Sequence, residues 1–257
     1  MTVREVYDYL LTELNKVEAP SLLLESFNYY HGKAINETCN QWYTGYETNQ
    51  LLTDNLRVLT RSSVRNKTTS NGLILYTLPD DYWHLLPGGV LNYTVTPSCA
   101  SEATTFQAPV IKLDSQMYSG IIKDYYTKPS HKRPYIFMHE ISVGTPAVTY
   151  NIQIKSGDTT KYMPTTLQID YLKKPKLPNK AIKDAESTTL SANQKNLWLL
   201  ASELDSDIDT SALMEFPENF CYEIINKLTA LVLEQFGDQR LQSNLPINQS
   251  MLAQRQG

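Results

Sequence analysis

The spacing of apolar residues changes twice along this chain, and that change limits the folds that it can adopt. From Val3 to Val17 apolar residues recur every three or four positions, which is the pattern of one helix face. Between Leu73 and Tyr171 apolar and polar residues alternate, as in half-buried strands. A second helical pattern follows at 216–237. The order predicts an α+β fold, with a helical N-terminal pair and a long C-terminal helix packed with a mostly antiparallel, sandwich-like β core.

The N-terminal pattern predicts two helices. Thr2 and Glu5 have the spacing of a capping box, in which each side chain accepts a hydrogen bond from a free backbone N–H group. Pro20 ends the first helix. Ser21 is placed to cap a second helix that continues to about Trp42. Its expected buried face contains Leu23, Phe27, Tyr30 and Ala34.

The C-terminal pattern, FPENFCYEIINKLTALVLEQFG, has the clearest helix boundaries in the chain. Pro217 stands at the expected first helical position, acidic residues follow in the first turn, and Gly237 marks the stop. The stripe that should face a core, widened by Ile225 and Val232, contains Cys221, Ile224, Leu228, Leu231 and Gln235. A stripe of this width predicts packing over more than a narrow seam.

Four segments in the middle of the chain are predicted to be strands. They are LILYTL at 73–78, GVLNYTVTP at 89–97, VTYNIQIKSG at 148–157 and TTLQIDYL at 165–172. In the last of these segments, Leu167, Ile169 and Tyr171 are expected to face a core because side chains alternate along a strand.

The segments around these strands carry turn or loop signals. SSVRNKTTSNG at 62–72 is rich in polar turn formers. LPDDYWHLL at 78–86 favours a helical turn after its proline, and residues 113–135 are expected to be partly helical and then a Pro-bounded basic loop. Residues 176–212 are polar, with a short helix expected around Gln194–Leu204.

These patterns divide the chain into five segments. The expected boundaries are 1–60 for an N-terminal helical segment, 61–175 for a β-rich core with helical and loop insertions, 176–212 for a polar excursion, 213–237 for a C-terminal helix of the core, and 238–257 for a tail arm. The excursion is a long connection and therefore a candidate interaction surface. The tail is either an unanchored end or an arm that becomes ordered on a neighbouring subunit.

The composition argues against several classes of protein. The chain of 257 residues has a formal net charge of −4, whereas dedicated nucleic-acid-binding proteins are usually basic. The three cysteines are far apart and form no C-x-x-C motif, so neither a disulfide framework nor a zinc site is expected. No apolar run approaches a membrane span, so no membrane partner is expected. The 17 tyrosines suit half-buried strand positions and wet protein–protein contacts.

Residues that often take part in catalysis do not form a recognisable constellation. His31, His84, His131 and His139 are neither paired at i,i+4 nor clustered with cysteine. His139 precedes Glu140, but adjacent strand residues point to opposite faces. No nucleotide-binding or hydrolase motif occurs. We therefore expect no catalytic residue, no cofactor and no metal.

The acidic segment SELDSDIDTSALMEF resembles the start of a calcium-binding loop. Asp205, Asp207 and Asp209 alternate as the first ligands of such a loop do. The required Gly and bidentate Glu are replaced by Thr210 and Phe216, respectively. A solvated acidic turn is the better interpretation.

Two basic groups are candidates for contacts with other molecules. KPSHKRP contains Lys128, Lys132 and Arg133, and YLKKP contains Lys173 and Lys174. Neither group lies on the presented helix or ribbon that direct reading of a DNA sequence requires, although both are compatible with weak contact to phosphate. Solvated loop and strand-edge lysines are the commoner explanation.

The order of these motifs resembles that of virion structural proteins of crAss-like bacteriophages. The resemblance rests on the helical N-terminus, LPDDYWHLL, KPSHKRPY, LQIDYLKKP and FPENFCYEIINKLTALVLEQ. It extends from the first helix to Arg240 and is weakest across 176–212. Within this group the chain is most similar to the neck or ring proteins that join the portal to the tail.

The resemblance implies a non-enzymatic subunit of a ring of roughly twelve copies. Its partners would be copies of itself, the portal and other ring or tail proteins, and DNA would pass through the channel without sequence-specific binding. The protein would belong to the virion neck or tail and be assembled in the host cytoplasm. Candidate subunit contacts are Lys173, Lys174, Lys128, Lys132, Arg133 and Arg240. In a ring, the first two of these suit a neighbour's carboxylates better than phosphate.

Two other classes of function compete with this one. A carbohydrate- or receptor-binding β module would use Trp42, Trp83 or Trp198 to line a shallow site. A hydrolase would need an unfamiliar site around His84 or His139. Another minor capsid or tail role is a variant of the first interpretation.

Overall fold

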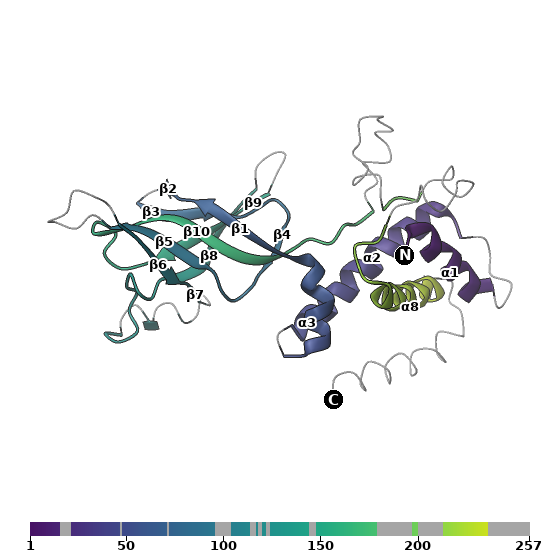
Figure 1. The fold of residues 1–257 in the computed structure, drawn as a ribbon. Helices are drawn as coiled ribbons and strands as arrows, with labels where there is room; N and C mark the ends of the chain where they lie inside the picture. The colour runs from purple at the N-terminus through teal and green to yellow at the C-terminus, as the bar shows by residue number, and fades with distance from the viewer. Residues whose placement is uncertain are drawn as a thin grey trace. The chain divides into compact units, whose positions relative to one another are not determined.

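The computed structural model describes residues 1–15, 22–46, 48–70, 72–95, 104–113, 117, 120–121, 124–143, 148–178, 197–199 and 213–235. The chain divides into two units. The helical unit comprises Met1–Val58 and Pro175–Gly257, and the strand unit comprises Leu59–Lys174 (Figure 1). The protein is therefore α+β, with helices at both ends of the sequence and mostly antiparallel strands between them.

The described helices include the three that the sequence pattern predicts, although the N-cap of the second is Leu23 and not Ser21 as expected. They are α1 (Val3–Asn15), α2 (Leu24–Thr44), α3 (Gln50–Leu56), the 3-10 helix η1 (Arg57–Leu59) and α8 (Glu218–Gln235). The capping box of α1 is confirmed: the Thr2 backbone N–H donates to Glu5 Oε2 at 2.7 Å, and the Glu5 N–H donates to Thr2 Oγ1 at 3.1 Å. The expected placement of Leu23 is wrong, because this residue precedes α2 and is 71% exposed.

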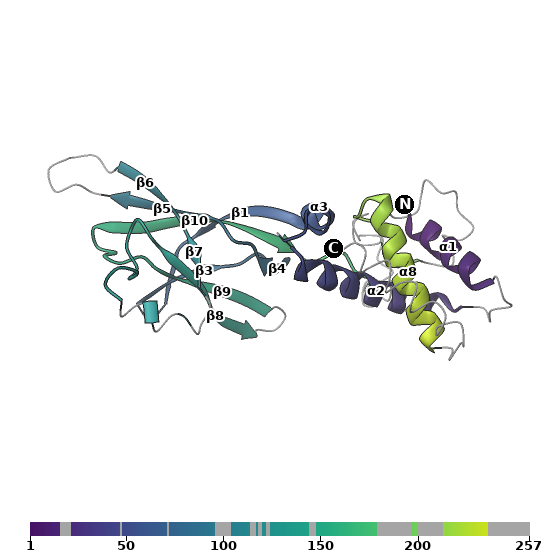
Figure 2. The same ribbon diagram turned by 90° about the horizontal axis from the view of Figure 1, so that it is seen from below.

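Helix α8 packs against both α1 and α2, as Figure 2 shows. The buried residues of α8 are Cys221, Ile224, Ile225, Leu228, Leu231, Val232 and Leu233. Trp42 of α2 lies edge-on to Phe216 and Phe220, and its indole N–H donates to Glu223 Oε2 at 3.1 Å. The wide stripe predicted for this helix thus covers two neighbours, which places α8 in the helical unit, but Gln235, the last residue assigned to the stripe, is exposed.

The strand unit consists of two sheets. Its strands are β1 (Thr60–Asn66), β2 (Thr68–Ser70), β3 (Leu73–Thr77), β4 (Tyr82–Leu85), β5 (Val90–Val95), β6 (Thr104–Pro109), β7 (Ile111–Lys112), β8 (Tyr135–Val143), β9 (Val148–Lys155) and β10 (Tyr162–Lys173). One sheet has the order β1-β10-β5-β6, with β4 also paired to β10, and the other has the order β2-β3-β9-β8-β7. Among the described strands only the β7–β8 pair is parallel.

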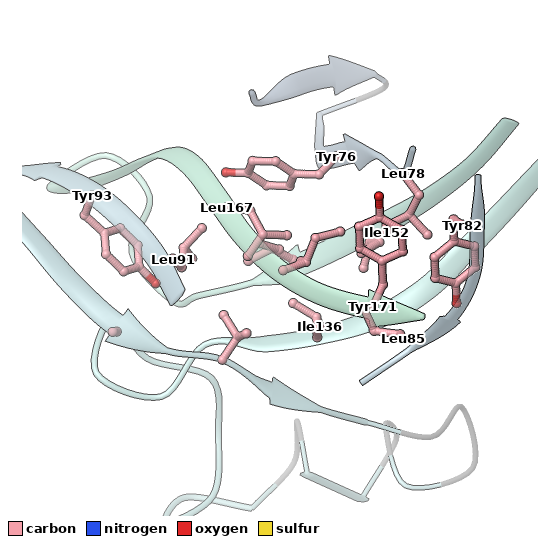
Figure 3. Packing of buried hydrophobic residues seen from close by; sticks show 14 residues of the cluster. Tyr76, Leu78, Tyr82, Leu85, Leu91, Tyr93, Ile136, Ile152, Leu167 and Tyr171 are labelled. Atoms are coloured by element: carbon pink, nitrogen blue, oxygen red, sulfur yellow. The ribbon is translucent and has the colours of Figure 1, made fainter. Parts of the chain in front are cut away.

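The hydrophobic core of this unit lies between the two sheets (Figure 3). Leu167 and Ile169 of β10 are fully buried, while the intervening Gln168 is exposed. From the facing sheet, Tyr76, Ile136 and Ile152 are also fully buried. The predicted sandwich and the predicted inward face of β10 are confirmed. Burying each such aliphatic side chain contributes about 1.5–3 kcal/mol relative to exposure.

Two predictions about the strand unit are wrong. Residues 62–72 were assigned to polar turns by composition, but they contain most of β1 and all of β2. Strand β1 is held through its backbone by β10, and its side chains are largely exposed, Val64 at 61%. The helical turn after Pro79 is replaced by a tight turn, with the Tyr82 N–H donating to Pro79 O at 3.0 Å, and by strand β4.

The strand unit is inserted between two parts of the helical unit, and its two ends are neighbours. The chain enters along β1 and leaves along β10, and these strands pair antiparallel from Thr60↔Leu172 to Asn66↔Thr166. Entry and exit therefore lie side by side within the strand unit.

The segments that flank α8 are tied to the rest of the helical unit by polar contacts. Met214 N–H donates to Met1 O at 3.0 Å, and Lys176 N–H donates to Glu215 Oε2 at 2.9 Å. The side chain of Asn28 both donates to Leu199 O at 3.0 Å and accepts from Leu199 N–H at 2.9 Å. Residues 197–199 are a turn and not part of the helix expected around Gln194–Leu204, most of which lies outside the described residues.

Candidate functional site

Three of the predicted contact residues lie in one exposed loop, residues 124–134, here called the basic loop. Asp124 organises its first turn: Oδ2 accepts from Thr127 Oγ1 at 2.7 Å, and Oδ1 accepts from the Tyr126 N–H at 3.1 Å. The hydrogen bond from Thr127, followed by that from Tyr126, lowers the pKa of the Asp124 carboxyl group. Ser130 and Arg133 close a second turn through reciprocal backbone hydrogen bonds of 3.2 and 3.0 Å.

Two tyrosines accompany the cations of this loop. Tyr125 and Tyr126 are 74% and 85% exposed, and Lys128 Nζ lies 4.6 Å from the centre of the Tyr125 ring. Arg133 Nη1 donates to Tyr126 O at 3.1 Å, which braces the turn from within. Lys132 is exposed. The basic loop therefore presents aromatic rings and cations on a backbone that its own hydrogen bonds hold in place.

The basic loop is attached to the sheets at both of its turns. Tyr135 OH donates to Thr127 O at 2.8 Å, and its ring is buried. The His131 ring stacks on Tyr162, at the first residue of β10, with ring centres 3.8 Å apart and planes 3° apart. Burial, then the charges of Lys132 and Lys161, lower the pKa of His131.

The remaining described candidates, Lys173 and Lys174, lie at the opposite end of β10. Lys174 is exposed, its N–H donates to Asp81 O at 2.7 Å, and its Nζ lies 5.7 Å from the centre of the Tyr150 ring. Lys173 is half-buried and pairs with Tyr82 of β4 beyond a register shift. At about 3.3 Å per residue, β10 separates Tyr162 from Lys173 by about 36 Å. The two basic groups are therefore separate surfaces.

Sequence reasoning missed some residues at these two surfaces. Tyr125 and Tyr126 stand just before the basic sequence KPSHKRP, and two adjacent aromatic residues beside a basic sequence were the available signal. At the other surface, Tyr171 OH donates to Asp81 Oδ1 at 3.0 Å, and burial followed by this carboxylate raises the pKa of Tyr171. No local sequence pattern predicts a contact between residues so far apart in the chain. Arg240 lies outside the described residues.

The residues proposed for other chemistry are dispersed. Trp42 is buried in the helical unit, whereas Trp83 and Trp198 are half-buried. His84 is half-buried on β4, where burial and then the charge of Lys112 lower its pKa. The side chain of His139 lies outside the described part of the chain. Within that part, no three His, Cys, Asp or Glu side chains gather as metal ligands would.

The comparisons with known proteins identify no relative. No family model matches the chain, and no curated protein matches its sequence. Among the described helices, none has the length and apolar character needed to cross a bilayer.

Proposed function

We propose that this chain is a non-enzymatic structural subunit of a bacteriophage virion. In this proposal it forms a ring of roughly twelve copies in the neck, between portal and tail and around the DNA channel. It assembles in the host cytoplasm, and DNA passes it without sequence-specific binding. The proposal starts from the motif order of the sequence and is supported by the surfaces of the strand unit.

The observation that carries the proposal is the basic loop. Aromatic residues and arginine are enriched in protein–protein interfaces, and the basic loop exposes Tyr125 and Tyr126 beside three cations. Because hydrogen bonds already hold its turns, binding a partner would cost little additional ordering of the backbone. Such a preorganised, exposed aromatic loop is suited to contact with another protein.

The separation of the two basic groups also agrees with a ring. A ring is built from heterologous contacts, in which one surface of a subunit meets a different surface of the next. Each subunit therefore needs two contact surfaces that do not overlap. The basic loop and Lys173–Lys174, at opposite ends of β10, meet this requirement. Both surfaces are basic, so each would meet acidic or apolar groups of its neighbour.

The proposal is tested by measuring the mass of the purified chain by native mass spectrometry, alone and mixed with portal protein. A closed oligomer is expected, alone or on the portal. The double variants Tyr125→Ser/Tyr126→Ser and Lys173→Glu/Lys174→Glu should each reduce assembly while keeping the wild-type melting temperature. Val64→Ser, at a comparably exposed strand position, is the matched control. A strict monomer that ignores the portal, or full assembly of both double variants, contradicts the proposal.

A hollow in the helical unit favours one second candidate, carbohydrate binding. It has a volume of about 490 Å³, and its lining includes Tyr29, Trp198, Asn36 and Glu25. Aromatic faces with nearby polar groups suit sugar rings. Binding on a glycan array that is lost in Trp198→Ala and kept in Trp83→Phe would favour this candidate. Trp42 is not available for such contacts, because it packs inside the unit.

A further inference from the structure

A second feature of the strand unit is a lysine-lined hollow that sequence reasoning did not anticipate, here called the lysine hollow. Its volume is about 760 Å³, and it is open to solvent. Lys67, Lys128 and Lys155 line it together with apolar groups of Leu73, Ile74 and Met163. A lining of this kind combines positive charge with apolar surface.

Three separate segments bring the lysines of the hollow together. Lys67 links β1 to β2, and its N–H donates to Thr165 O at 3.2 Å. Lys155 ends β9, and Lys128 belongs to the basic loop. Gly157, at φ +79°, lets the last two segments approach, since a Cβ there would lie 3.1 Å from both Pro129 O and Ser130 Cα. The convergence depends on the fold and not on proximity in the sequence.

The charge of the lysine hollow is not balanced by its own lining. Within the described part of the chain, no Asp or Glu lines the hollow and no ion pair involves the three lysines. The acid that follows Gly157 is Asp158, whose Oδ1 accepts from Thr160 Oγ1 at 2.6 Å and from Thr160 N–H at 3.0 Å. An external anion is therefore the natural counter-charge.

The lining favours an acidic peptide over nucleic acid. A nucleic-acid backbone would satisfy the lysines but would leave the apolar groups of Leu73, Ile74 and Met163 without a partner. Among the described residues no aromatic side chain lines the hollow, so bases have no ring there on which to stack. A peptide in which carboxylates alternate with aliphatic side chains fits both parts of the lining.

The chain itself contains such a peptide. In Glu203–Asp209, ELDSDID, carboxylates at Glu203, Asp205, Asp207 and Asp209 alternate with Leu204, Ser206 and Ile208. We propose that the lysine hollow binds the Glu203–Asp209 segment of a second copy of the chain. The choice of a second copy rests on the proposed ring, which supplies neighbouring copies. This contact would make the acidic segment one half of a subunit interface.

The test uses two full-length variants and a zero-length carbodiimide cross-linker, which joins a lysine amine to a carboxylate in contact with it. One variant carries Lys67→Glu/Lys155→Glu and keeps its acidic segment. The other carries Asp205→Lys/Asp207→Lys and keeps its hollow. Mass spectrometry should find cross-links between the hollow lysines and residues 203–209 in the wild type, and lose most of them in each variant alone. Mixing the variants should restore them, and only contact between copies can do so.

Each other outcome overturns the proposal. If the wild type shows no cross-link, the proposed contact does not form. A wild-type cross-link that the mixture does not restore places the contact within one copy. Binding of duplex DNA that is lost in Lys67→Glu/Lys155→Glu assigns the hollow to nucleic acid. Val64→Ser, at an exposed strand position that is not among the residues lining the hollow, should keep the cross-link. A chain that still assembles with portal without this cross-link would retain the proposed function and lose only this inference.

Discussion

The buried histidine of the helical unit leads to a prediction about acid stability. His31 in α2 is fully buried and stacks on Phe27, with ring centres 5.3 Å apart. Neither ring nitrogen has a hydrogen-bond partner among the described residues. Burial lowers the pKa of His31 from 6.5 to about 4. Folding therefore requires the neutral ring, and protonation opposes folding.

The size of the effect follows from linkage. The stability that depends on the neutral ring is present above the unfolded pKa of 6.5 and is lost as the pH falls toward 4. At pH 5 the ring is protonated in the unfolded chain and neutral in the folded chain. With 1.36 kcal/mol per pKa unit, the helical unit should be about 2 kcal/mol less stable at pH 5 than at pH 7.

The assay is urea unfolding at both pH values, followed by tryptophan fluorescence. Trp83→Phe is introduced throughout, so that the signal comes from Trp42 and Trp198 in the helical unit. His31→Leu should remove most of the pH dependence and change stability little at pH 7, because no hydrogen bond is lost. His131→Asn, in the strand unit, is the control and should behave as the parent. A parent protein with equal stability at both pH values, or His31→Leu with the parent's acid loss, would refute the reasoning.

Two further predictions concern the backbone. Gly89→Ala should lower the free energy of unfolding by about 2 kcal/mol or more, because φ is +115° and the new Cβ would lie 2.7 Å from Gln168 O. Gly72→Ala, at φ +74° with open space around the new Cβ, should lower it by about 1 kcal/mol. Equal melting temperatures for the two variants would contradict this. Thr2→Ala should lower the free energy of unfolding by about 1 kcal/mol, because the capping box is lost. Thr12→Ala, within the same helix, should change the urea midpoint little or raise it.

What the sequence predicted well was local. The capping box of α1 and the buried stripe of α8 depend on residues within one or two helical turns. The local sequence pattern is therefore sufficient to predict both. The inward face of β10 is also visible, because Leu167 and Ile169 alternate with polar residues. In each case the residues that specify the structure are neighbours in the chain.

What the sequence did not predict depends on distant partners. Strand β1 has polar, exposed side chains and exists because its backbone pairs with β10, about a hundred residues later in the chain. Strand β4 replaces a plausible helical turn for the same reason. The three cations of the basic loop were predictable as a group because they adjoin one another. Their distance from Lys173–Lys174, and the convergence of Lys67 and Lys155, follow only from strand pairing.

Because the two ends of the strand unit lie side by side, the unit is suited to removal from this chain and insertion into another. Paired strands lie about 4.8 Å apart, so the connections at Thr60 and Leu172 can be bridged by a short linker once the residues between them are removed. The helical unit would then become a continuous chain, and the strand unit a cassette that another protein can accept within a surface loop. Exchanging such cassettes alters what a subunit touches without redesigning the helices that carry it.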